Sequence, residues 1–406
     1  MTELAHQRGY HQIATGKARV AHWASDGEQP KEPVAGLLAE VLTSHLGLDR
    51  PLTPMDLGFR SADEPSSPTH NLKPVAAPTA TTAKGLTGIG ASSETVRSYT
   101  HSSRRSDLQP GDIEDLELAV VQFSATYSAH PPMKLWQEVA RKRDRAATLL
   151  TQKRHTLREG RQLSHHAGKL SVILAWLAHD LGESEFVDAC CDDAWEQGHQ
   201  SDDLEIGAWA EDVRCTDALY AGRDLDAFNA ASRGLAVAPQ GSRVALRLMV
   251  QLARVYAKQG RQAAFEETMC RVRQGSERLP SHRAGLFGVD AAVVTSYGAS
   301  SQVWLGNHEG ALEWALEAIE LYEEMPLPHQ APTRLAIARL DLALAHLSLG
   351  DPQAAIGAAT AALAEGRIVQ SVLARARHVV YRLALRYPDV DGLPDLQKAL
   401  DGMPSV

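Results

Sequence analysis

The 406-residue sequence has few cysteines, few aromatic residues and no long hydrophobic run. Its four cysteines, Cys190, Cys191, Cys215 and Cys270, have no regular spacing, so we expect reduced thiols and no disulfide framework. The longest uncharged apolar run, Ser171 to Ala178, is far shorter than the roughly 20 residues that a helix needs to span a bilayer. The N-terminus carries no secretory pattern. These absences favour a cytoplasmic protein that does not contact a membrane.

Motifs of the common enzyme classes are also missing. The sequence contains no nucleophile elbow, Walker loop, H-E-x-x-H helix or Cys-x-x-Cys pair. Polar residues cluster between His179 and His199, around Cys190 and Cys191. Adjacent side chains on a helix point about 100° apart, so these two thiols cannot readily face one metal ion. We therefore predict no catalytic activity, no metal site and no cofactor.

The acidic charge is unevenly distributed. The chain carries 41 Lys and Arg against 50 Asp and Glu, a formal net charge of −9, but residues 1–60 are nearly neutral. DNA-binding domains usually have an excess of basic residues. The charge balance of the N-terminal part therefore argues against DNA binding.

Leucine and alanine dominate the sequence after residue 111, which favours helices packed on helices. A local pattern recurs there: an apolar segment ends near a glycine, a polar step follows, and an alanine-rich segment comes next. Glycine can adopt the left-handed conformation that ends a helix. The pattern thus predicts five helical hairpins, whose turns are marked by Gly182, Gly222, Gly260, Gly306 and Gly350.

A single hairpin cannot bury its own apolar face, so repeated hairpins stack into a solenoid. Small residues after the turns, such as Ala227, Ala311 and Ala355, let the two helices of a hairpin approach closely. The pattern resembles tetratricopeptide repeats, most strongly between Leu342 and Leu363. We therefore predict an all-α fold with a right-handed α-solenoid of tetratricopeptide-like hairpins.

Three parts are predicted along the chain. Residues 1–60 form a small, incomplete helix-turn-helix-like segment, residues 61–110 form a flexible linker rich in Ser, Thr, Ala and Pro, and residues 111–406 form the repeat domain. Between Gly111 and Gly160 we expect two helices that cap the solenoid. Leu116, Val120 and Phe123 lie on one apolar stripe of the first.

The N-terminal segment contains a candidate DNA-reading helix from Thr15 to about Ser25. Thr15 is a suitable N-cap, and Val20 and Trp23 lie on the face that a core would cover. In a helix-turn-helix the opposite face enters the major groove. The predicted DNA-binding residues are Lys17, Arg19 and His22.

Ala18 to Phe59 resembles a segment of actinobacterial helix-turn-helix/tetratricopeptide regulators of differentiation and secondary metabolism. Val20, Trp23, Gly27, Pro30 and the closing LTPMDLGF carry this resemblance. The layout of a short reader, a linker and helical repeats matches as well. The resemblance implies a transcriptional regulator.

The sequence departs from that family at its start, because only about fourteen residues precede the candidate helix. Three explanations are open: a start site assigned too late, which we favour, helices from the repeats or a partner that fill the gap, or a degenerate reader. Alternatively, residues 15–42 form an interaction hairpin that does not contact DNA.

Polar side chains on the first helices of the hairpins form a candidate binding site, since these helices line the concave surface of a solenoid. Arg243, Arg247 and Arg254 share one helical face, and three like charges on one face favour a nearby anion. The other candidates interrupt apolar helices or share a face with apolar residues: Trp209, Arg214, Asp217, Asp290, Tyr297, Arg334 and Asp341. Each could instead be an ordinary solvated or internally paired residue.

Together these features predict an intracellular transcriptional regulator. Its partners would be DNA, if the reader is complete upstream, and a peptide, protein or small anionic signal in the groove. We expect a homodimer if the protein reads paired half-sites. The alternative is a repeat scaffold that binds proteins and never contacts DNA.

Overall fold

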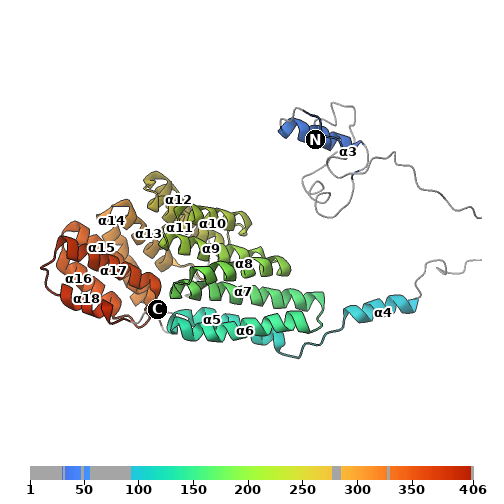
Figure 1. Ribbon diagram of the computed structural model, residues 1–406, viewed down its shortest axis with the longest axis horizontal. Coiled ribbons are helices and arrows are strands. Elements are labelled where there is room, and N and C mark those ends of the chain that lie inside the picture. The colour runs from blue at the N-terminus through green and yellow to red at the C-terminus, as the bar shows by residue number, and fades with distance from the viewer. Residues whose placement is uncertain are drawn as a thin grey trace, which may run out of the picture. The chain divides into compact units, whose positions relative to one another are not determined.

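The computed structural model describes residues 30, 33–46, 50–54, 93–276, 285–326 and 330–403. Every regular element within these ranges is a helix (Figure 1). The all-α prediction is therefore confirmed for the described residues. The chain divides into two units, Met1–Leu86 and Thr87–Val406. Among the described helices, none has the length and apolar character to cross a membrane.

The described part of the first unit centres on helix α3 (Val34–Leu46). Thr43 ties the following segment to this helix: its hydroxyl donates to the Ala39 carbonyl at 2.8 Å and accepts from the Leu52 amide at 2.8 Å. The buried side chains of the helix are Ala35, Leu37, Leu38 and Ala39. The predicted reading helix, with Lys17, Arg19 and His22, lies outside the described residues.

Helix α4 (Ser93–Ser103) lies within residues 61–110, the stretch predicted to be a flexible linker. Most of its described side chains are exposed, including Val96 and Tyr99. Glu94 in its first turn and His101 in its last turn complement the helix dipole. These charges are a local source of helix stability that the search for apolar periodicity did not detect.

Fourteen further helices form consecutive antiparallel pairs, and a short 3-10 turn, η2 (Tyr127–Ala129), joins the first two. The pairs are α5 (Asp112–Thr126) with α6 (Pro132–Gln152), α7 (Leu157–Leu181) with α8 (Ser184–Ser201), α9 (Leu204–Tyr220) with α10 (Asp224–Val237), α11 (Arg243–Lys258) with α12 (Gln262–Ser276), α13 (Ala291–Leu305) with α14 (His308–Glu323), α15 (Pro332–Leu349) with α16 (Pro352–Leu363), and α17 (Gln370–Arg386) with α18 (Leu393–Asp401). The two helices predicted between Gly111 and Gly160 are thus present, and Leu116, Val120 and Phe123 are buried.

The five predicted turn glycines separate the two helices of five pairs, and all have positive φ. At Gly182, φ is 80° and the backbone amide caps α7. A Cβ atom at this position would lie 2.9 Å from the Gln370 side chain, so both conformation and space favour glycine. The predicted close approach of the paired helices also holds, because Ala227, Ala311 and Ala355 are fully buried.

The first helices of the pairs form an inner row, in which α7, α9, α11, α13, α15 and α17 pack successively on one another (Figure 1). Each second helix packs on its own partner, and α8, α10 and α14 also pack on the first helix of the next pair. Large apolar side chains such as Leu170, Leu248 and Leu340 fill the space between the rows and are completely buried. This arrangement places one face of every inner helix toward a common interior.

The inner row closes on itself through Arg367, which precedes α17. Its guanidinium donates to the His130 carbonyl at 2.9 Å, to Thr333 at 2.9 Å and to the Asp180 carboxylate at 2.7 Å. It also lies 4.7 Å from the centre of the Tyr127 ring, and the Tyr127 hydroxyl donates to Asp180. Burial and the adjacent Asp180 carboxylate raise the pKa of Tyr127 well above its usual value. This contact, the Arg367 clasp, joins the first hairpins to the last.

We predict that Arg367→Ala lowers the free energy of unfolding by about 3–5 kcal/mol, because Asp180 would stay buried without its cation. Hydrogen exchange should rise in α5 and α17 together. Arg377→Ala on the exposed side of α17 is the matched control and should change stability by less than about 0.5 kcal/mol. Chemical denaturation measures both, and equal stability of the two variants would contradict the assigned role of the clasp.

A second prediction concerns His166 on α7, whose Nδ1 is buried without a hydrogen-bond partner. Burial, together with His165 and Lys169, lowers its pKa from 6.5 to about 4. The unfolded chain then binds more protons than the folded chain between these values, so stability should fall as pH decreases from about 6.5 to about 4. His166→Gln should flatten this part of the stability profile. An unchanged profile in thermal unfolding would assign the acid sensitivity to other groups.

Candidate functional site

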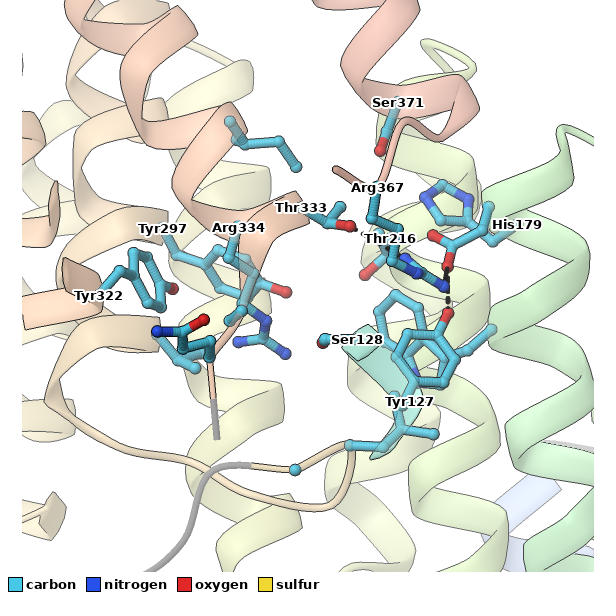
Figure 2. A pocket seen from close by; sticks show the side chains of 18 of the residues that line it. Tyr127, Ser128, His179, Thr216, Tyr297, Tyr322, Thr333, Arg334, Arg367 and Ser371 are labelled. Carbon is cyan, nitrogen blue, oxygen red and sulfur yellow. Dashed lines mark hydrogen bonds and ion pairs between the residues drawn. The ribbon is translucent and has the colours of Figure 1, made fainter. Parts of the chain in front are cut away.

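The inner helices enclose a cavity next to the Arg367 clasp (Figure 2). Residues from α5, η2, α7, α9, α11, α13, α14, α15 and α17 line it, together with the segments that precede α13, α15 and α17. Its atom-free space, including solvent at the open mouth, is about 930 Å³. The cavity is therefore large enough for several waters or a small ligand.

Tyr297 on α13 lies at the base of one side of this cavity. Its hydroxyl accepts a hydrogen bond from Arg247 at 2.8 Å. The guanidinium of Arg254 stacks on its ring, 4.2 Å from the ring centre. An aromatic face attracts a cation through its quadrupole, so Tyr297 positions Arg254 without neutralising it.

Arg254 is a buried cation without a carboxylate partner. Its side chain is 1% exposed, and its Nη1 donates to the Gln251 amide oxygen at 2.7 Å. The buried Nε has no hydrogen-bond partner. Within the described part of the chain, no Asp or Glu forms an ion pair with Arg254. Because buried charges are normally paired, this position favours an anion from outside the chain.

Arg334, in the first turn of α15, is a second arginine at this cavity, and it is half-buried. Figure 2 shows it together with Tyr297 and Tyr322 on one side of the cavity. Its buried Nη1 has no partner, and no ion pair to it occurs among the described residues. Asp290 lines the same cavity, but its carboxylate caps α13 by accepting from the Val293 amide at 2.9 Å.

Burial raises the pKa of Tyr322 to about 12, with smaller effects of Arg334 and Asp290. The Tyr322 hydroxyl therefore stays protonated at neutral pH, and it lies close to Ser296 and Arg334. It is a potential hydrogen-bond donor beside Arg334. A carboxylate or phosphate bound here could accept from both groups.

The opposite side of the cavity has balanced charges. Asp180 pairs with Arg367 in the clasp, and His179 Nδ1 lies 3.1 Å from Asp217. Asp217 also pairs with Arg223 at 2.9 Å. The unbalanced positive charge is thus concentrated on the side of Arg254 and Arg334.

Four of the ten candidates predicted in the repeat domain meet at this cavity: Arg254, Asp290, Tyr297 and Arg334. The three arginines that were predicted to share one binding face have different environments in the structure, and only Arg254 lines the cavity. Arg247 is completely buried, and its Nε lies 3.1 Å from Asp212, so its anion comes from α9. Arg243 is half-buried at the start of α11 and does not line the cavity.

The remaining candidates form internal contacts. Trp209 packs edge-on against Phe287, with ring centres 5.4 Å apart. Arg214 pairs with Glu211 at 2.8 Å and with acidic residues of α8. Asp341 is fully buried and pairs with Arg375. These side chains hold helices together and do not line the inner cavity.

The sequence analysis missed several cavity residues, including Tyr127, Tyr220, Tyr322 and Arg367. Tyr127 lies in a short turn and Arg367 lies between helices, where helical periodicity gives no information about facing. Arg367 follows Gly366 at the end of a predicted repeat. A charged residue at such a junction indicates a possible contact between hairpins, but the sequence does not show that Asp180 is the residue it pairs with.

A family model described as the SP15 N-terminal domain matches residues 1–60. These are the residues that the sequence analysis assigned to the first part of the chain. The comparisons with curated proteins and with solved structures returned no match.

The different environments of two arginines on α11 give a testable contrast. Arg254→Met removes a buried charge that has no carboxylate partner, so unfolding free energy should stay the same or increase by about 1–2 kcal/mol. Arg247→Met leaves Asp212 without its cation and should cost about 3–5 kcal/mol. Denaturant titration in an anion-poor buffer measures both changes. Equal losses in the two variants would show that Arg254 stabilises the fold itself.

Proposed function

We propose that this protein is an intracellular transcriptional regulator that senses a small anionic ligand. In this proposal residues 1–60 contain a helix-turn-helix-like DNA reader, as the family resemblance implies. Residues 111–406 form a right-handed repeat domain of the tetratricopeptide type that binds the ligand. The observation that carries the sensing role is the pair of unpaired arginines, Arg254 and Arg334, at one cavity.

The enclosed form of the cavity favours a small ligand over a protein or a long peptide. Helices from both ends of the inner row surround it, and the Arg367 clasp restricts one side. Concave sites lined by aromatic side chains and a few polar groups are the usual binding sites of small molecules. Arg254 and Arg334 would bind a carboxylate or phosphate group, while Tyr297 and Tyr322 provide aromatic surface and hydroxyl groups.

The two arginines come from different hairpins, which suggests how binding could act on the fold. Arg254 lies on α11 and Arg334 on α15, and α13 packs between these helices. A shared anion would favour the arrangement that holds α11 and α15 closest. A ligand shifts a conformational equilibrium only through such a difference in affinity. We propose that the resulting change in repeat curvature or assembly alters reader spacing through residues 61–110.

The near-neutral charge of residues 1–60 favours a second candidate function. A reader usually carries an excess of basic residues that binds the phosphate backbone. Without such contacts, the N-terminal segment would be an interaction hairpin and the protein a ligand-regulated scaffold. The two candidates share the cavity and differ in whether the chain binds DNA.

The ligand prediction can be tested with inorganic phosphate and malonate as probes. At constant ionic strength, both anions should raise the melting temperature of the full chain, because a ligand that binds only the folded state stabilises it. Arg254→Met and Arg334→Met should each remove this increase. The control Lys398→Gln, on the exposed face of α18, should retain it. The same increase in all variants would reflect general salt effects and reject the site.

DNA binding can be tested by selecting duplexes from a random pool with the full chain at moderate salt. We expect enrichment of a sequence motif, and replacement of Lys17 or Arg19 by Glu should weaken binding, with the slope of log K against log salt reduced by about 1 per lost phosphate contact. Lys398→Glu is the control in the repeat domain. If a version extended upstream, with an intact reader, also enriches no motif, the protein is the ligand-regulated scaffold.

A further inference from the structure

A second cavity lies beside the first in the interior of the repeat. Tyr220 lines both cavities, and Arg254 stacks on rings of both: Tyr297 in the first at 4.2 Å and Trp304 in the second at 5.4 Å. The second cavity has about 700 Å³ of atom-free space including its mouth. The two cavities therefore share Tyr220, and Arg254 contacts one ring from each lining.

Most of the second cavity is apolar. Its lining includes Trp304 and Val303 of α13, Leu344 of α15 and Leu219 of α9. Trp304 is half-buried, and the Arg254 guanidinium and the Lys258 Nζ lie 5.4 Å and 5.0 Å from its ring centre. Such a lining favours a hydrophobic body that packs beside the indole.

The polar groups at this cavity are positively charged or can become so. Lys258 at the end of α11 and His378 on α17 are exposed, and Arg375 lies deeper. No Asp or Glu of the described residues lines the cavity. Arg375 is already paired with the buried Asp341, so Lys258 and His378 remain for a ligand.

The cations surround His378 from several helices. Arg375 and Arg382 come from its own helix and Lys258 from α11, while His308 of α14 also lies near Arg382. Burial and these positive charges lower the pKa of His378 below its usual value. A bound anion would offset the positive field and favour protonated imidazolium.

We propose that this second cavity binds an apolar anion, with its hydrophobic body against Trp304, Val303 and Leu344 and its acidic group between Lys258 and His378. The ligand class is a ring or short acyl chain that carries one carboxylate, sulfonate or phosphate. The site lies outside the cavity on which the proposed function rests. It depends neither on DNA binding nor on Arg334.

Isothermal titration of the full chain with naphthalene-2-sulfonate tests this site. We expect saturable one-to-one binding, at least about tenfold tighter than that of the neutral naphthalene-2-methanol. Inorganic sulfate at the same concentration should not compete, because it lacks the hydrophobic body. Equal binding of the charged and neutral compounds, or displacement by sulfate, would overturn the proposed ligand class.

Substitutions of Lys258 and His378 test whether naphthalene-2-sulfonate binds in the second cavity. Lys258→Gln and His378→Gln should each lower the affinity for naphthalene-2-sulfonate about threefold, which is typical of an exposed charge pair. The double variant should lower this affinity about tenfold. Lys398→Gln and Arg334→Met should bind like the parent protein. Because Lys258 and His378 are exposed, their replacement should leave the melting temperature unchanged. Unchanged affinity in the double variant would reject the site, and loss of binding in Arg334→Met would place the compound in the first cavity.

The pH dependence of binding is an independent readout. Affinity should increase as pH falls from 8 toward 6, because binding the anion favours protonation of His378. His378→Gln should remove this increase while keeping the contribution of Lys258. A parent protein with no pH dependence in this range would show that His378 does not face the bound acidic group. Failure of phosphate and malonate at the first cavity would leave these outcomes unchanged and would affect only the proposed sensing role.

Discussion

The ion pair between Arg367 and Asp180 determines what kind of interior this protein has. An α-solenoid of stacked hairpins normally presents an open concave surface. Here the segment before α17 returns to α7 and η2, and the buried pair is completed by Tyr127, Thr333 and the His130 carbonyl. A buried pair is stable only when its remaining hydrogen-bonding groups are satisfied. These additional contacts meet that condition, and they bring residues from both ends of the helical row to one cavity.

The hairpins could be predicted from sequence because their determinants are local. A glycine that must adopt positive φ, such as Gly182 or Gly350, marks a helix end within a few residues, and the alanine after the turn follows from the same contact. Helical periodicity likewise placed Leu116 and Phe123 in the core. Helix α4 was missed because its side chains are mostly exposed, and its stabilising charges give no apolar periodicity.

The cavity could be predicted only in part, since its determinants are not local. Periodicity places Arg247 and Arg254 on one face of α11, but it does not reveal that Asp212 pairs with the first and that no carboxylate pairs with the second. The clasp joins residues 187 positions apart in the chain. A single sequence indicates which face of a helix is polar, whereas the packing of several hairpins decides whether that face meets water, a carboxylate or a cavity.

The inner arginines differ in one respect that links both proposed sites. Arg247, Arg367 and Arg375 each have a carboxylate from the chain, so their charges serve the fold. Arg254 has none, and its guanidinium stacks on rings that line two separate cavities. The fold itself leaves the charge of Arg254 uncompensated, so this residue differs from the arginines whose carboxylate partners come from neighbouring helices.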